Sequence, residues 1–482
     1  MEKRMAGIRS WRLLPALCAA GALSWTAWAR PAPSRALATR LAEGPELIGI
    51  VHWGLNTYTD REWGYGDEDP AMLNPAAFDA DQIVGACRAA GIGGLVVVAK
   101  HHDGFCLWPT KTTGHNIAKS PFRGGRGDYV REMEQACRRA GMKFGVYVSP
   151  WDRHDADYAR PEYVGRYHAQ IRELLDGGYG EVFEMWFDGA NGGDGFYGGA
   201  REKRSFPSAS EYYRYGEVFR FVRALQPKAT IFSGESDDSD FRWPGNERGI
   251  LEPDSRATIV TVGGFANCKY GNPCYPNLIN SGSPTGAFFR ACEADFPLRK
   301  GWFYHERERG TTKSAAYLTK LYLSSVGNAG TMNIGIAPNR DGLLDADDVK
   351  ALAGFGHLRN ALFAHKANPG EPFNVVVMRE DISRGEQVDA WEFVADGKAI
   401  LRGKSIGARR IRVLERPCSA KSCEVKVLED GGDFQGVSFR LYMADPDLVR
   451  LVLSATTESG ETDTARWMTS PRISPILQNA NR

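Results

Sequence analysis

The chain has 482 residues, of which 43% are hydrophobic and 25% charged, and its formal net charge is +1. These proportions are those of an ordinary globular protein, and the length allows a large hydrophobic core. Because the charge is nearly balanced and no block of like charge occurs, nothing in the sequence favours binding to nucleic acid or to an anionic membrane.

Residues 1–29 have the layout of a secretory signal peptide. A basic segment over residues 1–12 precedes the apolar run LLPALCAAGALSWTAWA, which ends in an A-x-A pattern at Ala27 to Ala29. This order is typical of a cleaved export signal. An uncleaved membrane anchor is the alternative, but a run of seventeen residues is at the short limit for a span. We therefore expect an exported protein, periplasmic or secreted, without a membrane anchor.

Apolar strands alternate with amphipathic helices from residue 45 to residue 363. The predicted strands cover 47–54, 94–100, 143–149, 181–187, 229–234 and 331–338. The predicted helices cover 79–91, 128–141, 161–178, 210–227 and 313–327, and several end at glycine or proline. Repeated strand–helix units with nearly continuous apolar strands indicate a parallel sheet buried on both faces. The sequence therefore predicts an α/β fold, a (β/α)8-like barrel, irregular where strands cannot be recognised.

A different pattern of predicted elements follows the barrel region. Short strands separated by turn residues are predicted at 373–381, 389–396, 398–407, 409–416, 423–430 and 437–443, with no helical pattern between them. This spacing predicts a C-terminal β-sandwich over residues 370–458. Residues 459–482 form a polar tail, which we expect to be loosely held.

Eight cysteines remain once the presequence is set aside. Export makes disulfides possible, and the pairs Cys268 with Cys274 and Cys418 with Cys423 are close enough in sequence to close small loops. Cys87 and Cys137 fall in helical patterns and are expected to be buried thiols. No pair has the C-x-x-C spacing of a zinc site, so a structural role is expected for all of them.

Polar and aromatic residues gather where the predicted strands end. They are His52, Trp53, Lys100 to Asp103, Tyr147, Trp151, Asp152, Trp186, Asp188, Glu235, Arg242, Trp243 and Glu247. Core packing or an ordinary ion pair explains each of them taken alone. In parallel barrels, however, active sites form at the C-terminal ends of the strands, so their coincidence predicts an active site there.

Two adjacent histidines follow the strand at 94–100. On a strand, His101 and His102 would face opposite sides. One of them could serve a metal site, but no H-x-H or H-E-x-x-H motif accompanies them. Hydrogen bonding of neutral imidazoles to a hydroxylated ligand fits the pattern better.

Many tryptophans fall at predicted strand ends and in loops: Trp53, Trp63, Trp108, Trp151, Trp186 and Trp243. Core packing is the simpler interpretation. The functional interpretation is a sugar-binding cleft, because the apolar faces of sugars stack on aromatic rings.

Asp188 ends an apolar strand at an unusual place for a charge. A carboxylate there is costly if it is buried without a partner, and Gly189 allows close approach of a ligand. The following glycine-rich stretch is not a helix start, so a helix cap is disfavoured and a catalytic role is favoured. A glycosidase requires a second carboxyl group, and Glu235, Glu247 and Glu293 are candidates that spacing alone does not separate.

Six segments carry a family resemblance: HWGLNTYTDREWGYG, AKHHDGFCLWPT, GVYVSPWDRH, YGEVFEMWFDGA, FRWPGNERG and KGWFYHERE. Together they resemble the α-L-fucosidases of glycoside hydrolase family 29, from about residue 48 to the β-domain. EWGYG and RWPGNERG are similar to the subgroup that prefers α-1,3/1,4-linked fucose.

The resemblance implies a retaining mechanism without a metal or cofactor, on a barrel followed by a β-sandwich. It implies that Asp188 is the nucleophile and Glu247 the acid/base, with Glu293 as a rival. The implied substrate is a fucosylated oligosaccharide or glycoconjugate. The positions that match substrate-binding residues are His52, Glu62, Trp63, His101, His102, Tyr147 and Trp186, with Arg242 and Trp302 as neighbours.

Two alternatives stay open at this point. One is a metal-dependent barrel hydrolase that uses His52, His101, His102 and Asp188. The other is a non-catalytic fucose-binding protein on the same barrel, which the presence of both Asp188 and Glu247 disfavours.

Overall fold

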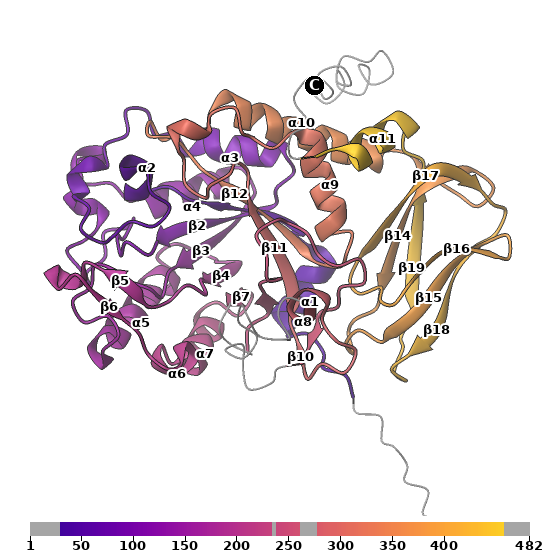
Figure 1. The fold of residues 1–482 in the computed structure, drawn as a ribbon, viewed down its shortest axis with the longest axis horizontal. Helices are drawn as coiled ribbons and strands as arrows, with labels where there is room; N and C mark the ends of the chain where they lie inside the picture. Colours follow the sequence, from indigo (N-terminus) through magenta and orange to yellow (C-terminus); the bar gives the residue numbers. More distant parts are fainter. Residues whose placement is uncertain (1–28, 234–237, 261–276, 457–482) are drawn as a thin grey trace, which may run out of the picture.

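The computed structural model describes residues 29–233, 238–260 and 277–456 (Figure 1). The predicted signal peptide, except for Ala29, lies outside this part of the chain, as do Glu235, the Cys268 and Cys274 pair and the predicted tail at 459–482.

Eight parallel strands close into a barrel, which confirms the predicted fold class (Figure 1). In order around the barrel they are β1 (Leu47–Val51), β12 (Thr331–Ile336), β11 (Ala291–Pro297), β8 (Phe241–Arg242), β7 (Thr230–Ser233), β4 (Glu184–Phe187), β3 (Lys143–Val148) and β2 (Gly94–Lys100). The sequence predicted six of these strands and missed β8 and β11. β8 is too short to show a pattern, and β11 carries two acidic residues in an otherwise apolar run.

Helices pack around the barrel at or near the predicted places. They are α3 (Ala80–Ala89), α4 (Tyr129–Arg139), α5 (Pro161–Leu175), α7 (Tyr215–Leu225) and α9 (Ala315–Ser325). α10 (Ala346–Leu362), which the sequence did not predict, packs against α3 and α9. Asp79, Asp128 and Ser314 accept hydrogen bonds from backbone N–H groups at the starts of α3, α4 and α9. The helix predicted over 210–227 is instead broken in two, α6 (Ala209–Tyr212) and α7, because Arg214 between them takes a left-handed conformation with φ 54°.

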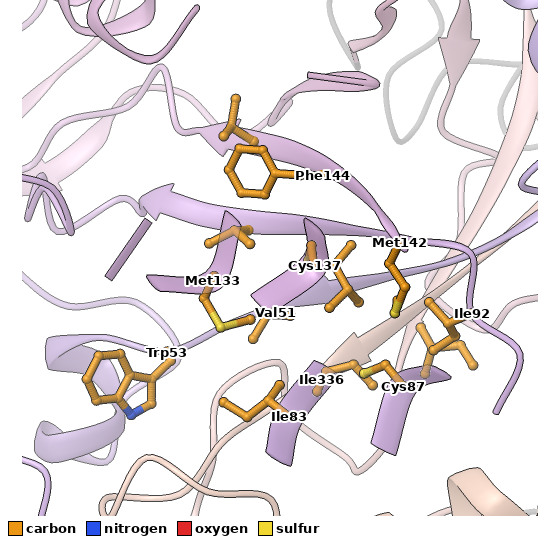
Figure 2. Close-up of a cluster of buried hydrophobic side chains, with 14 of the residues drawn as sticks. Val51, Trp53, Ile83, Cys87, Ile92, Met133, Cys137, Met142, Phe144 and Ile336 are labelled. Carbon is orange, nitrogen blue, oxygen red and sulfur yellow. The ribbon is translucent and has the colours of Figure 1, made fainter. Parts of the chain in front are cut away.

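The main core lies between the outer face of the barrel and its helices (Figure 2). Val51 and Ile336 project from neighbouring strands and meet Ile83 and Cys87 of α3. Cys137 of α4 completes the layer, and burial raises the pKa of both thiols. The prediction that these two cysteines are buried thiols is therefore confirmed.

Several short elements lie in the segments between barrel strands. They are α2 (Leu55–Thr59), the hairpin β5 (Gly193–Gly195) and β6 (Glu202–Arg204), the pair β9 (Thr258–Ile259) and β10 (Phe288–Phe289), and α8 (Asn277–Ser281). A further unpredicted helix, α1 (Arg35–Glu43), precedes β1. In the described residues no helix has the length and apolar character needed to cross a bilayer.

Two antiparallel sheets form the C-terminal domain, as predicted (Figure 1). One contains β13 (Lys366–Ala367), β19 (Val437–Tyr442), β14 (Pro372–Glu380) and β17 (Arg410–Ser419); the other contains β16 (Lys398–Gly403), β15 (Val388–Ala395) and β18 (Cys423–Asp430). Phe373, Trp391 and Phe393 are among the buried side chains of their shared core. After the last strand comes α11 (Pro446–Ser454), which the sequence did not predict and which packs against α9 and β17. Cys418 and Cys423 are free thiols.

Candidate active site

A cavity of about 730 Å³ lies where the barrel strands end, at the edge where the sequence places its polar and aromatic residues. As far as Asp188, the side chains of its wall are Ile50, His52, Glu62, Trp63, His101, His102, Tyr147, Trp151, Trp186 and Asp188. Asn191, Asp194, Lys203, Phe232, Trp243, Glu247, Ile279, Asp295 and Trp302 complete it. Of the catalytic and substrate-binding residues that the family resemblance implies, all except Arg242 and Glu293 therefore meet in one cavity. Trp53, Lys100 and Asp103, also at predicted strand ends, do not line it.

Asp188 follows β4 directly, and hydrogen bonds hold both of its carboxylate oxygens. The Tyr147 hydroxyl donates to Oδ2 at 2.8 Å, and the Ala190 backbone N–H donates to Oδ1 at 2.6 Å. Burial, followed by the Asp188 charge, raises the pKa of Tyr147 well above its usual value, so Tyr147 stays a donor. The carboxylate at the end of this apolar strand is thus compensated and borders the cavity.

Three histidines of the wall are neutral at physiological pH. Burial lowers the pKa of His52 to about 3 and that of His102 to about 4, and it lowers the pKa of His101 well below its usual value. The expectation that His101 and His102 face opposite sides is wrong, because β2 ends at Lys100. Their ring centroids are 4.0 Å apart and both rings line the cavity.

The hydrogen-bond partners of His101 and His102 leave a donor nitrogen on one ring and an acceptor nitrogen on the other. Asn56 Nδ2 lies 3.3 Å from His101 Nδ1 and donates to it, which leaves a proton on Nε2. Ser149 gives its only hydroxyl proton to the Trp151 carbonyl at 2.9 Å, so it accepts from His102 Nδ1 at 2.7 Å. His102 Nε2 is then an acceptor. Side by side, the pair can bind one hydroxyl group as donor and another as acceptor.

Glu247 stands in the loop after β8, solvent-exposed at the mouth of the cavity. Its Oε2 accepts a hydrogen bond of 3.1 Å from Trp302 Nε1. Desolvation, together with the charges of Asp188 and Glu62, raises the pKa of Glu247, while the Trp302 hydrogen bond opposes this shift. A raised pKa favours the protonated form of Glu247, which general acid catalysis requires.

Glu62 joins two loops at the mouth of the cavity. Its carboxylate accepts from the Trp302 backbone N–H at 2.9 Å and from the Phe303 N–H at 3.2 Å. His305 Nε2 lies 2.6 Å from the same carboxylate. Next to it, Trp63 is 53% exposed on the rim. The loop after β1 therefore fixes the loop that carries Trp302.

Trp186 forms part of an aromatic wall of the cavity, and a hydrogen bond to Glu293 fixes its ring. Its ring stacks on Phe232 at 4.0 Å and on Tyr147 at 5.2 Å between centroids. Its Nε1 donates to Glu293 Oε1 at 2.9 Å. Glu293 is fully buried and does not line the cavity; it also accepts from Asn333 Nδ2 at 2.9 Å. Glu293 thus supports Trp186 from outside the cavity.

Arg242 does not line the cavity, contrary to the expectation of a substrate neighbour. Its guanidinium is fully buried and donates to the backbone carbonyls of Ile279 at 2.8 Å, Arg256 at 2.6 Å, Ala257 and Arg290. Its neighbour Trp243 lines the cavity instead. Among the other tryptophans, Trp53 and Trp108 belong to the hydrophobic core.

The sequence reasoning missed Asp295 and the side chains of the β5–β6 hairpin. Asp295 lies in β11, the strand that was not recognised, and its position two residues after Glu293 puts both acids on the inner face of the barrel. The glycine-rich stretch after Asp188 was the only signal for the hairpin that supplies Asp194 and Lys203. In the described residues no group of three or more His, Cys, Asp or Glu side chains is arranged to hold a metal ion.

Comparisons with known proteins agree with the motifs. The α-L-fucosidase family model matches residues 24–360. Alpha-L-fucosidase 1 of Arabidopsis thaliana is 37% identical over 317 residues, which are 66% of this chain and 58% of that protein. Human plasma alpha-L-fucosidase is 30% identical over 291 residues, 58% of this chain and 53% of that one. The chain thus spans a little over half the length of these curated relatives.

The comparison of folds agrees with the family match. A glycoside hydrolase 29 family member from an unknown rumen bacterium has a crystal structure that superposes with a TM-score of 0.78 at 31% identity, covering 90% of this chain and 80% of that one. With its family model matched across the whole barrel, the chain belongs to the α-L-fucosidase family, glycoside hydrolase family 29.

Proposed function

We propose that the protein is a retaining exo-α-L-fucosidase that removes terminal α-linked L-fucose from oligosaccharides or glycoconjugates. One observation carries the proposal: Asp188 and Glu247 line the same cavity in different environments. Hydrogen-bond donors occupy both carboxyl oxygens of Asp188, whereas the surroundings raise the pKa of Glu247. Two carboxyl groups in unlike environments are what a double-displacement glycosidase requires.

In the first step, an Asp188 carboxylate oxygen attacks the anomeric carbon of fucose. A bond forms between that oxygen and the carbon as the glycosidic bond breaks, and the bonding electrons move to the leaving oxygen. Glu247 gives this oxygen its proton, so the leaving sugar departs as a neutral alcohol.

In the second step, the ionised Glu247 removes a proton from a water molecule. The water oxygen attacks the anomeric carbon, and the ester bond to Asp188 breaks, which restores the carboxylate. Two inversions at one carbon retain its configuration.

The remaining wall suits a 6-deoxy sugar. The neutral His101 and His102 supply a donor and an acceptor for hydroxyl groups, and the buried His52 Nδ1 has no protein partner in the described residues. Ile50 and Phe232 add an apolar surface that suits the methyl group of fucose.

The linkage preference is proposed to be α-1,3/1,4. The two segments similar to that subgroup bring Glu62, Trp63, Trp243 and Glu247 to the cavity wall. Glu247 acts on the leaving oxygen, so this side of the cavity is where the leaving sugar lies. Export is proposed from the presequence alone.

The test compares hydrolysis of α-1,2-, α-1,3-, α-1,4- and α-1,6-fucosylated oligosaccharides with that of an aryl α-L-fucoside, and follows the anomer released by NMR. Release of the α-anomer supports the retaining mechanism, and turnover limited to 1,3/1,4 linkages supports the subgroup. Initial release of β-fucose refutes retention. Activity lost on exhaustive chelation favours the metal-dependent alternative, and fucose binding without turnover of any substrate favours the non-catalytic one.

A further inference from the structure

Asp295 is a buried acid in the cavity wall that lacks a complete set of partners. It lies in β11, two residues before that strand ends at Pro297, and is 4% exposed. Its Oδ1 has no hydrogen-bond partner in the described part of the protein. A buried polar atom left unpaired costs about 1–3 kcal/mol, so an unpaired oxygen on a side chain of the cavity wall indicates that this carboxyl group contacts a ligand.

The neighbours of Asp295 leave that oxygen free for a ligand. The Trp243 indole is hydrogen-bonded to the Asp295 carboxyl group. Asn333, opposite Asp295 on β12, directs its amide N–H to Glu293 instead. Glu293, the other acid of β11, has its Oε1 occupied by Trp186 and Asn333. Of the two acids on this strand, only Asp295 lines the cavity.

The charge state of Asp295 suits a sugar. Burial, followed by the nearby carboxyl groups of Glu247 and Asp188, raises its pKa well above the usual range. The raised pKa favours the neutral carboxylic acid, which both donates and accepts hydrogen bonds. A neutral group of this kind binds a hydroxyl without adding a further negative charge beside Asp188.

The position in the barrel indicates which part of the substrate is contacted. Around the closed sheet, three strands separate β11 from β3 on either side, so Asp295 stands across the barrel from Tyr147. Asp295 belongs to a strand, whereas Glu247 stands in a loop at the mouth. A sugar unit bound between these walls reaches Asp295 from inside the cavity, and the leaving sugar lies toward the mouth.

We propose that Asp295 is a further substrate-contacting residue, whose carboxyl group hydrogen-bonds a hydroxyl group of the L-fucosyl unit bound in the cavity. The proposal rests on the proposed function, because it takes L-fucose as the occupant. It assigns to Asp295 the binding of the sugar, separate from the nucleophile and acid/base roles of Asp188 and Glu247.

The test titrates L-fucose, which is a product and is not turned over, into the wild-type protein and into three variants by calorimetry. Asp295→Asn keeps the shape and a neutral donor and acceptor, so its affinity is expected to stay within about threefold of wild type. Asp295→Ala removes the contact and is expected to weaken binding about tenfold or more, which is about 1.4 kcal/mol. Asp295→Ser keeps a short polar side chain and provides the measurement if the alanine variant does not fold.

Monodeoxy analogues of L-fucose identify the hydroxyl group. The analogue that lacks the contacted hydroxyl is expected to bind the wild-type protein weakly. Its affinity should not fall further in Asp295→Ala, because the analogue has already lost the contact that the substitution removes. Wild-type affinity for L-fucose in Asp295→Ala or Asp295→Ser overturns this inference alone. A wild-type protein that neither binds L-fucose nor hydrolyses fucosides overturns the proposed function itself.

Discussion

The Tyr147 hydroxyl donates a hydrogen bond of 2.8 Å to Asp188 Oδ2, joining the ends of two neighbouring barrel strands. Tyr147 is buried and stays protonated, so the hydrogen bond has a fixed direction. With the Ala190 N–H on the other oxygen, it holds the carboxylate in one orientation beside the cavity. A nucleophile held in this way does not need to be ordered at the moment of attack.

Asp188→Asn is expected to lower kcat for an aryl α-L-fucoside about 10⁴-fold or more, because an amide is a poor nucleophile and cannot form the ester. The amide keeps the size of the side chain, so the melting temperature should stay near that of wild type. Asp81→Asn, an exposed change on α3, is the matched control and should retain full activity. Near-normal turnover in Asp188→Asn would remove Asp188 from the nucleophile role.

Tyr147→Phe tests the hydrogen bond to the nucleophile. It removes one donor from a charged acceptor, an interaction worth about 1.5–3 kcal/mol, so kcat is expected to fall about 10- to 100-fold. The phenyl ring preserves the stacking on Trp186. A circular dichroism melt checks the fold, and an unchanged kcat would show that the hydrogen bond does not contribute to the transition state.

Glu247→Ala removes the proposed acid. Turnover of an oligosaccharide is expected to fall about 10²- to 10⁴-fold, with a smaller loss for an aryl fucoside whose leaving group needs little protonation. Azide, which needs no general base, should restore turnover of the aryl fucoside in this variant and yield a fucosyl azide. The matched comparison is Glu293→Ala, which disturbs Trp186 but lies outside the cavity, so azide should not rescue it. Rescue of the Glu293 variant instead would move the acid/base role.

Trp302→Phe tests the charge environment of Glu247. The Trp302 N–H favours the ionised carboxylate and so lowers the pKa of Glu247 against the larger effect of desolvation. Removing that donor raises this pKa further. Glu247 must be protonated for the first step, and activity is lost as pH rises through its pKa. The alkaline limb of the kcat/KM profile is therefore expected to move to higher pH, and a shift to lower pH would contradict the assignment.

Patterns that repeat along the chain predicted most of the fold. Strands such as β2 are apolar throughout because the parallel sheet is buried on both faces, and the helices between them end at glycine or proline. β11 was not predicted as a strand because Glu293 and Asp295 interrupt its apolar run, although both face the interior of the barrel. Acidic residues inside a barrel are a functional exception to the pattern from which strands are recognised.

The residues of the candidate site were predicted better than their contacts. Motif spacing brought Asp188, Tyr147 and Glu247 to one cavity, but it could not separate Glu247 from Glu293, because the difference depends on which loop or strand carries each acid. Arg242 shows the same limit. Its motif lies at the site, while its side chain turns to backbone carbonyls that are distant in sequence.

Arg242→Met separates a structural role from a substrate-binding one. The side chain is buried without contact to the cavity, and its removal leaves the carbonyls of Ile279, Ala257, Arg256 and Arg290 without this donor. We expect the free energy of unfolding to fall by about 3 kcal/mol or more, measured by urea denaturation at neutral pH. At a temperature where the variant is folded, KM for an aryl fucoside should stay near the wild-type value, since no substrate contact is lost. Arg412→Met is the matched control: that arginine also donates to backbone carbonyls, at the junction with the β-sandwich, and it does not line the cavity. A large rise in KM in Arg242→Met, with stability unchanged, would instead return Arg242 to the substrate-binding set.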